Sequence, residues 1–171
     1  TQIFMAAQAD PTVMIGGTLP MLHSGYRVGH GDTIILESCE YCNSFLNFFP
    51  TVAVILNVEA DHLDFFKDLT DVERSFHAFA DLVPQNGFVI ANADDPGAMD
   101  AVKGLAHPVF TFSVKDEAAD CRADQVAYHD GCGEFDVVIH GKFYAHIALA
   151  VAGKHNVSNA LAAAAAAYVL G

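Results

Sequence analysis

The chain has 171 residues, of which 53% are hydrophobic and only 17% are charged. This length and composition fit one globular domain of ordinary size with enough apolar side chains for a core. With 8 basic and 21 acidic residues the formal net charge is −13, so too few cations are present to line a nucleic-acid surface. No apolar run reaches the roughly 18 residues of a transmembrane helix and no signal peptide is recognisable, so we expect a cytoplasmic protein without a membrane partner.

The first part of the chain is expected to form a helix and a short strand. Apolar residues stand at helical spacing within residues 1–9, but no capping residue precedes them, so we expect the chain to open inside a helix that starts upstream. Residues 12–15 are expected to form a buried strand that runs into a loop at Gly16 and Gly17. That loop is either a tight turn or a place where backbone approaches a ligand.

Two further apolar segments, residues 33–36 and 52–56, are expected to be buried strands. Residues 52–56 are too apolar and too β-branched for an exposed edge, which indicates that both faces are covered. Strands of this kind are typical of a parallel sheet with helices on each side.

The polar residues that follow these two strands form the first candidate site. Glu37 and Glu40 follow the first strand, and the second is followed by Asn57, Glu59, Asp61, His62 and Asp64. Ligands collect beyond the carboxyl ends of strands in open α/β sheets, and Mg²⁺ takes one or two protein carboxylates beside phosphates and waters. The pattern therefore indicates a metal or phosphate site, with solvated carboxylates as the alternative.

The four cysteines could form two disulfides or one zinc site. Only Cys39 and Cys42 have the C-x-x-C spacing of metal ligands, whereas Cys121 and Cys132 are farther apart. Because nothing in the sequence indicates secretion, reduced structural thiols are the favoured interpretation, with metal or redox chemistry as the alternative.

A helix and another strand follow. Thr70-x-x-Glu73 is a capping box, and the helix that it opens places apolar residues on one face over residues 70–83. Residues 87–90 form a strand that ends in the polar run Asn-Ala-Asp-Asp-Pro. The alternation of strand and helix predicts an α/β fold with a mainly parallel sheet flanked by helices.

The pattern changes between about residues 109 and 151. Residues 135–139 and 143–149 alternate apolar and polar side chains around a glycine turn, which predicts an antiparallel hairpin. We expect this region to be an antiparallel β appendage at the edge of the sheet, with one exposed face. Its histidines are expected to be structural or surface residues: His129, His140 and His146.

The chain ends in an alanine-rich segment of very high helix propensity, which extends to Tyr168. His155, Asn156 and Asn159 lie around its first turn. They can cap the helix or serve a ligand at its free N–H groups, and spacing alone favours capping.

Four motifs, ESCEYCNSFL, NVEADHLD, NADDP and GKHNVSNALAA, stand in this order over nearly the whole chain. Together they resemble the central ATPase domain of the Mur ligases, most closely the branch that adds L-alanine to UDP-N-acetylmuramate in peptidoglycan synthesis. The resemblance implies a P-loop NTPase-like fold, ATP and Mg²⁺ as cofactors, and amide-bond formation through an acyl phosphate.

The resemblance also implies roles for individual residues. Glu40 would hold Mg²⁺ at the γ-phosphate, and His62 would contact a second Mg²⁺ near the acyl phosphate. The remaining roles concern binding: His155, Asn156 and Asn159 would line the adenine and ribose pocket, and Asn57, Gly16 and Gly17 would face the UDP-sugar carboxylate.

Two departures from the family pattern matter. The glycine-rich phosphate loop ending in Gly-Lys-Thr is absent, so we expect a chain cut before residue 1, without the UDP-sugar and C-terminal domains, that is inactive alone. Several Mur ligases carry a carbamylated lysine in the helix after the histidine motif. No lysine lies between residues 71 and 83, which fits the alanine-adding branch.

Two alternatives stay open. The first is another amide ligase of the same superfamily, of the folylpolyglutamate or cyanophycin synthetase type, which shares the histidine motif. The second is a non-catalytic metal-binding module with no nucleotide role. The sequence does not indicate an oligomeric state.

Overall fold

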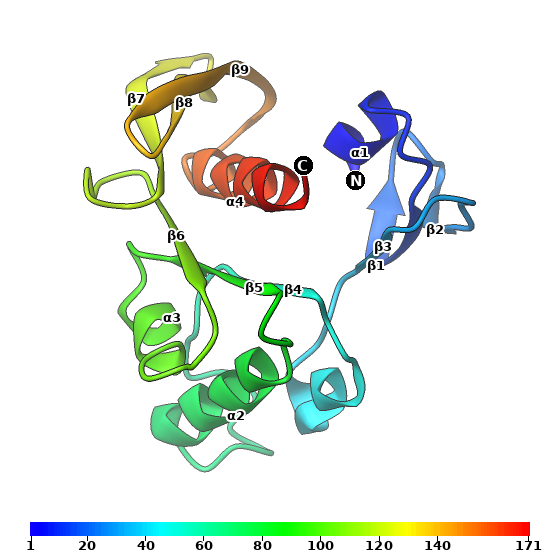
Figure 1. Cartoon of the computed structure of the whole chain (residues 1–171), viewed down its shortest axis with the longest axis vertical. Coiled ribbons are helices and arrows are strands. Elements are labelled where there is room, and N and C mark those ends of the chain that lie inside the picture. The colour runs from blue at the N-terminus through cyan, green and yellow to red at the C-terminus, as the bar shows by residue number, and fades with distance from the viewer. The chain divides into compact units, whose positions relative to one another are not determined.

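The computed structural model describes all residues, 1–171, and the chain forms two compact units, Thr1–Cys39 and Glu40–Gly171 (Figure 1). The first contains a three-stranded sheet of order β2-β1-β3, and the second a six-stranded sheet of order β4-β5-β6-β7-β8-β9. No helix is both long enough and apolar enough to span a bilayer.

The Thr1–Cys39 unit consists of one short helix and three strands: α1 (Gln2–Ala6), β1 (Thr12–Leu19), β2 (Ser24–Arg27) and β3 (Ile34–Leu36). β1 pairs antiparallel with β2 and parallel with β3. Asp10 and Arg27 form an ion pair within the unit. The hydrogen bond from Arg27 is the main cause that lowers the pKa of Asp10 to about 2.

Three predictions for this unit are wrong. Residues 12–15 form a strand but not a buried one, because only Val13 of them is buried and Met14 is 51% exposed. Gly16 and Gly17 do not form a loop, because β1 continues through them where its register with β2 shifts, and residues without a Cβ tolerate such an irregularity. The strand over 33–36 is not buried: β3 is an edge strand, and its Ile34 is 66% exposed.

The Glu40–Gly171 unit alternates strands and helices and ends in a long helix. Its elements are η1 (Tyr41–Asn47), β4 (Val52–Ile55), α2 (Leu69–Asp81), β5 (Phe88–Asn92), α3 (Pro96–Ala101), β6 (Val109–Ser113), β7 (Cys121–His129), β8 (Cys132–Ile139), β9 (Lys142–Ala152) and α4 (His155–Leu170). Strands β4 to β7 pair in parallel, and β7 to β9 pair antiparallel. The predicted α/β fold with a mainly parallel sheet and an antiparallel addition is confirmed; the antiparallel pairing begins at β7, because β6 pairs parallel with β5.

Strand β5 shows how both faces of the sheet are covered. Val89 and Ala91 belong to a core with η1, α2 and α3, whereas Ile90 belongs to a core with α4. Figure 1 shows α4 on one side of β5 and α2 with α3 on the other. Since successive side chains point to opposite faces, this strand must be apolar from Phe88 to Ala91, as its sequence indicates.

Helix α2 begins earlier than the predicted capping box. Its N-cap is Asp68, whose carboxylate accepts a hydrogen bond from the backbone N–H of Asp71 at 3.0 Å. The capping box of Thr70 and Glu73 is therefore wrong, because an acid two positions upstream already satisfies the helix terminus. His77 on this helix is hydrogen-bonded through Nδ1 to the carbonyl of Ala101 at 2.8 Å, a local structural role.

Candidate active site

Glu40 and His62 lie together. Nε2 of His62 is 3.4 Å from Oε1 of Glu40, and both side chains are partly exposed. The polar residues after the two predicted strands thus meet at one place, as a single candidate site requires, but the two residues do not follow neighbouring strands of one sheet. β3 and β4 belong to different sheets, and Glu40 instead occupies the N-cap of η1, from which it meets the loop after β4.

His62 sits on a strained turn. Its φ is 53°, in the left-handed region that non-glycine residues seldom occupy, and its N–H donates to Oδ1 of Asp61 at 2.7 Å. Its carbonyl accepts from the N–H groups of Phe65 and Phe66, at 2.8 and 2.9 Å. Phe66 is only 3% exposed, so the downstream end of the turn is anchored in the core. Strain held by surrounding packing is common at functional sites.

Tyr41 contacts His62 directly, which the sequence analysis did not anticipate. The two ring centroids lie 4.8 Å apart with planes tilted by 39°. The Tyr41 hydroxyl donates to Oδ2 of Asp64 at 3.0 Å, and this carboxylate raises the pKa of Tyr41. The only feature of the sequence that could have indicated these contacts is the position of the two residues: Tyr41 follows Glu40, and Asp64 lies two residues after His62.

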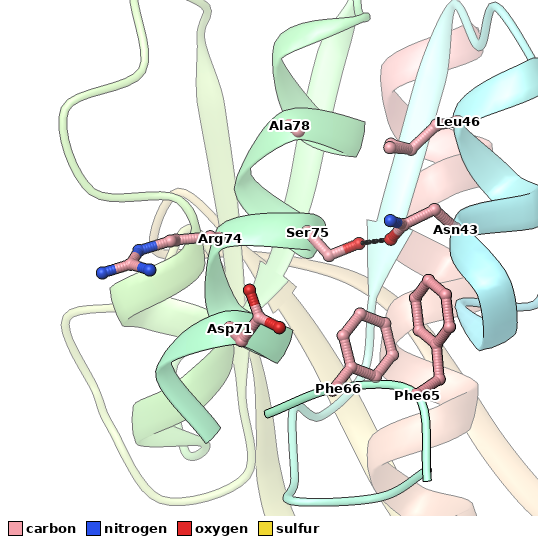
Figure 2. Close-up of a pocket in the computed structure, with 8 residues that line it drawn as sticks. All are labelled: Asn43, Leu46, Phe65, Phe66, Asp71, Arg74, Ser75 and Ala78. Carbon is pink, nitrogen blue, oxygen red and sulfur yellow. Dashed lines mark hydrogen bonds between the residues drawn. The ribbon is translucent and has the colours of Figure 1, made fainter. Parts of the chain in front are cut away.

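A cavity of about 280 Å³ lies between η1, α2 and the His62 loop (Figure 2). Its lining residues are Asn43, Leu46, Phe65, Phe66, Asp71, Arg74, Ser75 and Ala78. Ser75 donates to the side-chain oxygen of Asn43, and the N–H of Asn43 donates to the carbonyl of Glu40 at 2.8 Å. Figure 2 shows the Phe65 and Phe66 rings beneath Asn43, so the Glu40 turn and the His62 turn border one cavity.

The start of α4 carries the predicted nucleotide-binding residues. Nδ2 of Asn156 donates to the carbonyl of Ala152 at 2.9 Å, and Nδ2 of Asn159 lies 3.4 Å from Oδ1 of Asn156. His155 and Asn159 are exposed. No hydrogen bond or ion pair joins these residues to Glu40 or His62, and their role toward a nucleotide stays a prediction.

The residues predicted to face the sugar carboxylate lie in different units. Asn57 lies two residues after the end of β4 and is exposed. Gly16 lies in the Thr1–Cys39 unit, where its N–H donates to Oε2 of Glu37 at 2.9 Å, and no atom lies near the position of a Cβ at Gly17. Their substrate role stays a prediction.

Glu40 and His62 fit cations that are held mainly by other ligands. They offer one carboxylate and one imidazole for the two predicted Mg²⁺ ions, and no cluster of three or more His, Cys, Asp or Glu side chains could hold a metal alone. Mg²⁺ commonly takes only one or two protein ligands and fills its octahedron with phosphate oxygens and waters. The donor set thus fits a metal–phosphate site better than an all-protein site.

The strand before His62 is not buried as predicted: β4 is an edge strand of its sheet, and Val54 and Leu56 are each 40% exposed, so the two faces of residues 52–56 are not both covered. The fold and the Glu40–His62 pair nevertheless define the class of protein: an α/β domain in which an acid and a histidine meet beyond the end of a strand, the arrangement expected of a phosphate-handling enzyme. The chain belongs to the Mur ligase family, because the family model described as the Mur ligase middle domain matches residues 19–167.

Two relatives show the degree of similarity. The chain is 45% identical over 163 residues to UDP-N-acetylmuramate–L-alanine ligase from Caldanaerobacter subterraneus subsp. tengcongensis, covering 95% of this chain and 35% of that protein. It is 43% identical over 170 residues to the ligase of the same name from Caldicellulosiruptor saccharolyticus, covering 99% and 37%. The chain thus spans little more than a third of the length of these relatives.

Solved structures show the same fold. UDP-N-acetylmuramate:L-alanyl-gamma-D-glutamyl-meso-diaminopimelate ligase from Neisseria meningitides superposes with a TM-score of 0.84 at 27% identity, covering 99% of this chain and 56% of that one. UDP-N-acetylmuramate-alanine ligase from Thermotoga maritima gives a TM-score of 0.81 at 27% identity, covering 99% and 37%.

Proposed function

We propose that residues 1–171 are the ATP-binding middle domain of a longer ligase that joins L-alanine to UDP-N-acetylmuramate in peptidoglycan synthesis. The observation that carries this proposal is the 3.4 Å approach of His62 to Glu40 on two loops of a domain that is 45% identical to such ligases. In the longer chain, a UDP-sugar domain precedes this one and a C-terminal domain follows it.

In this reaction the γ-phosphoryl group of ATP passes to a carboxylate oxygen of the sugar nucleotide, and ADP leaves. The amine nitrogen of L-alanine then attacks the acyl carbon, the phosphate leaves with the bonding electron pair, and the amine loses a proton. Glu40 would hold one Mg²⁺ at the γ-phosphate, and His62 would contact a second Mg²⁺ near the acyl phosphate. When bound, these ions would neutralise charge on the transferring phosphoryl group. Tyr41 packs against the His62 ring and limits its rotation.

The binding roles are proposed for the other predicted residues. His155, Asn156 and Asn159 contact adenine and ribose at the start of α4, where backbone N–H groups and amide side chains are available. Asn57, Gly16 and Gly17 face the carboxylate that becomes phosphorylated. This assignment rests on the shared motifs, not on contacts within the chain.

Substrate dependence of ADP release by the full-length protein tests the proposal. We expect ADP release to require both UDP-N-acetylmuramate and L-alanine. Release that requires a tripeptide in place of L-alanine would favour the activity named for the Neisseria structure. Release that requires a folate and glutamate would contradict the proposal, and so would the absence of any ligase activity.

The 171-residue chain by itself should not turn over ATP. Its only Gly-Lys pairs, at Gly141 and Gly153, are not followed by Thr, so no phosphate-binding Gly-Lys-Thr loop is present in the chain. With a net charge of −13, any binding of an ATP analogue should be weak and should require Mg²⁺. Steady ATP turnover by this chain, abolished by Glu40→Ala, would contradict this expectation.

A further inference from the structure

The backbone immediately after β4 is held by two side chains, one from the last residue of β5 and one from the N-cap of α3. The ladder between β4 and β5 ends at the pair Ile55 and Ala91, so the following residues have no strand partner. Nδ2 of Asn92 donates to the carbonyl of Leu56 at 2.9 Å, and Oδ1 of Asp95 accepts from the N–H of Val58 at 3.1 Å. These two bonds flank Asn57 on either side.

Both side chains are themselves fixed by the start of α3. Oδ1 of Asn92 accepts from the N–H of Asp94 at 3.0 Å, and Oδ1 of Asp95 also accepts from the N–H of Ala98 at 2.7 Å as the helix N-cap. A further contact comes from Gly97, where an added Cβ would collide with the carbonyl oxygen of Val58. The strand end is therefore clamped against a rigid helix start.

We propose that Asn92 and Asp95 are positioning residues for His62. Val58 is 4% exposed and Phe66 is 3% exposed, so the loop that carries His62 is anchored at two buried ends. Asp95 fixes the upstream end of this loop at Val58. Two further hydrogen bonds order the residues between Val58 and the imidazole: Asp61 N–H donates to the Glu59 carbonyl at 2.9 Å, and His62 N–H donates to Oδ1 of Asp61. If the backbone at Val58 is no longer held, the following residues up to His62 can move with it, and the imidazole can move away from Glu40.

The catalytic consequence rests on the proposed function. If Glu40 and His62 act together on the phosphoryl group, loosening the clamp lowers kcat and leaves the substrate KM values nearly unchanged, because misplacing a catalytic group affects the chemical step more than ground-state binding. The structural consequence, displacement of the His62 ring, does not depend on that function.

Three variants and one control isolate the clamp. Asp95→Ala removes the acceptor, whereas Asp95→Asn keeps an oxygen that can accept from both N–H groups. Asn92→Asp loses the donor to the Leu56 carbonyl but keeps the acceptor for the Asp94 N–H. The matched control is Asp94→Ala, because Asp94 accepts from Ser113 Oγ and from the Val114 N–H, each at 2.7 Å, and makes no bond to the loop.

The experiment measures, by NMR on the 171-residue chain, hydrogen exchange of the Val58 amide and the nuclear Overhauser effect between the His62 and Tyr41 rings. Asp95→Ala should speed Val58 exchange about tenfold, the size expected for losing one hydrogen bond, and should weaken the ring–ring signal. Asn92→Asp should weaken that signal too. Asp95→Asn should restore both readouts, and Asp94→Ala should change neither.

Rapid Val58 exchange in Asp95→Ala with an unchanged ring–ring signal would overturn the proposal, as would failure of Asp95→Asn to restore that signal. If Asp95→Ala does not fold, the test rests on Asn92→Asp. An unchanged His62–Tyr41 signal in that variant would then overturn the proposal. Kinetics of the same variants in the full-length ligase separate the two claims. An inactive wild-type protein contradicts the proposed function, while the NMR result still decides how His62 is positioned.

Discussion

The hydroxyl of Tyr41 donates to the carboxylate of Asp64 at 3.0 Å, across 23 positions of sequence. This bond joins the start of η1 to the loop after β4, and the Tyr41 ring lies against His62 between them. The site is therefore braced by an aromatic residue in addition to the direct approach of Glu40 to His62.

Replacing Tyr41 by Phe should reduce catalysis more than stability. The ring that packs on His62 remains, but the bond to Asp64 is lost, so we expect kcat of the proposed full-length ligase to fall about threefold to tenfold. The free energy of unfolding should fall by at most about 1 kcal/mol, because the bond is exposed. Steady-state kinetics and urea unfolding check both values. Tyr144→Phe is the control, and equal losses of kcat in the two variants would contradict a specific role for Tyr41.

Phe45 should be essential for holding η1 on the domain. It is 2% exposed, stacks on Phe79 with centroids 4.7 Å apart, and meets the edge of Phe76 at 5.2 Å. Phe45→Ala should therefore lower the free energy of unfolding by about 3–5 kcal/mol. In urea titrations, Phe143→Ala should cost little, because Phe143 is 66% exposed. Similar losses for both would show that the η1 core is not packed as described.

The fold was readable from sequence where burial dictates composition. β5 needs apolar side chains on both faces because Val89 packs toward α2 and Ile90 toward α4. A strand with one face in solvent would instead alternate apolar and polar residues. The first turn of α2 was misread, because Asp68 and Thr70 are both good caps and only the helix register decides between them.

The site was readable only in part. Motifs predicted Glu40 and His62 as site residues, and the structure brings their side chains within 3.4 Å, but the sequence could not show that the strands preceding them belong to different sheets. The partnership of Val58 with Asp95 spans 37 positions and depends on how α3 meets the end of β4. Such pairings follow from tertiary structure, and neither periodicity nor local propensity encodes them.

His146 should make stability depend on pH. It lies 2.7 Å from Asp136 and 3.3 Å from Glu134, which also faces His129, and the hydrogen bond to Asp136 is the main cause that raises the pKa of His146 above its usual 6.5. Stabilisation by the protonated imidazole is complete below that usual value and disappears as pH rises through the raised pKa.

His146→Gln should therefore destabilise the chain more at about pH 5 than at about pH 9. Thermal unfolding at both pH values measures the difference. The control is His23→Gln, at an exposed histidine without a carboxylate partner. Its loss of stability should not be larger at about pH 5 than at about pH 9. A His146→Gln effect that grows with pH would have the wrong sign for this account.

Cys121 should be chemically inert in the folded protein. Burial is the main cause that raises the pKa of its thiol to about 12, and the residue is 0% exposed. Since the thiolate is the reactive form, iodoacetamide at about pH 8 should modify the exposed Cys39 and Cys42 long before Cys121. Peptide mass spectrometry with and without denaturant follows each site. Labelling of Cys121 at the rate of Cys39 in native buffer would contradict its burial.

The most direct test of the central claim is the turnover number of the proposed full-length ligase carrying Glu40→Gln. Gln has nearly the same shape but no charge to hold Mg²⁺ at the phosphoryl group, so we expect kcat to fall by a factor of about one hundred or more with an unchanged unfolding midpoint. Glu73→Gln, on α2, is the matched control and should keep wild-type turnover. A Glu40→Gln enzyme that turns over as fast as the Glu73→Gln enzyme would contradict the assignment of Glu40 as a residue that holds Mg²⁺ at the phosphoryl group.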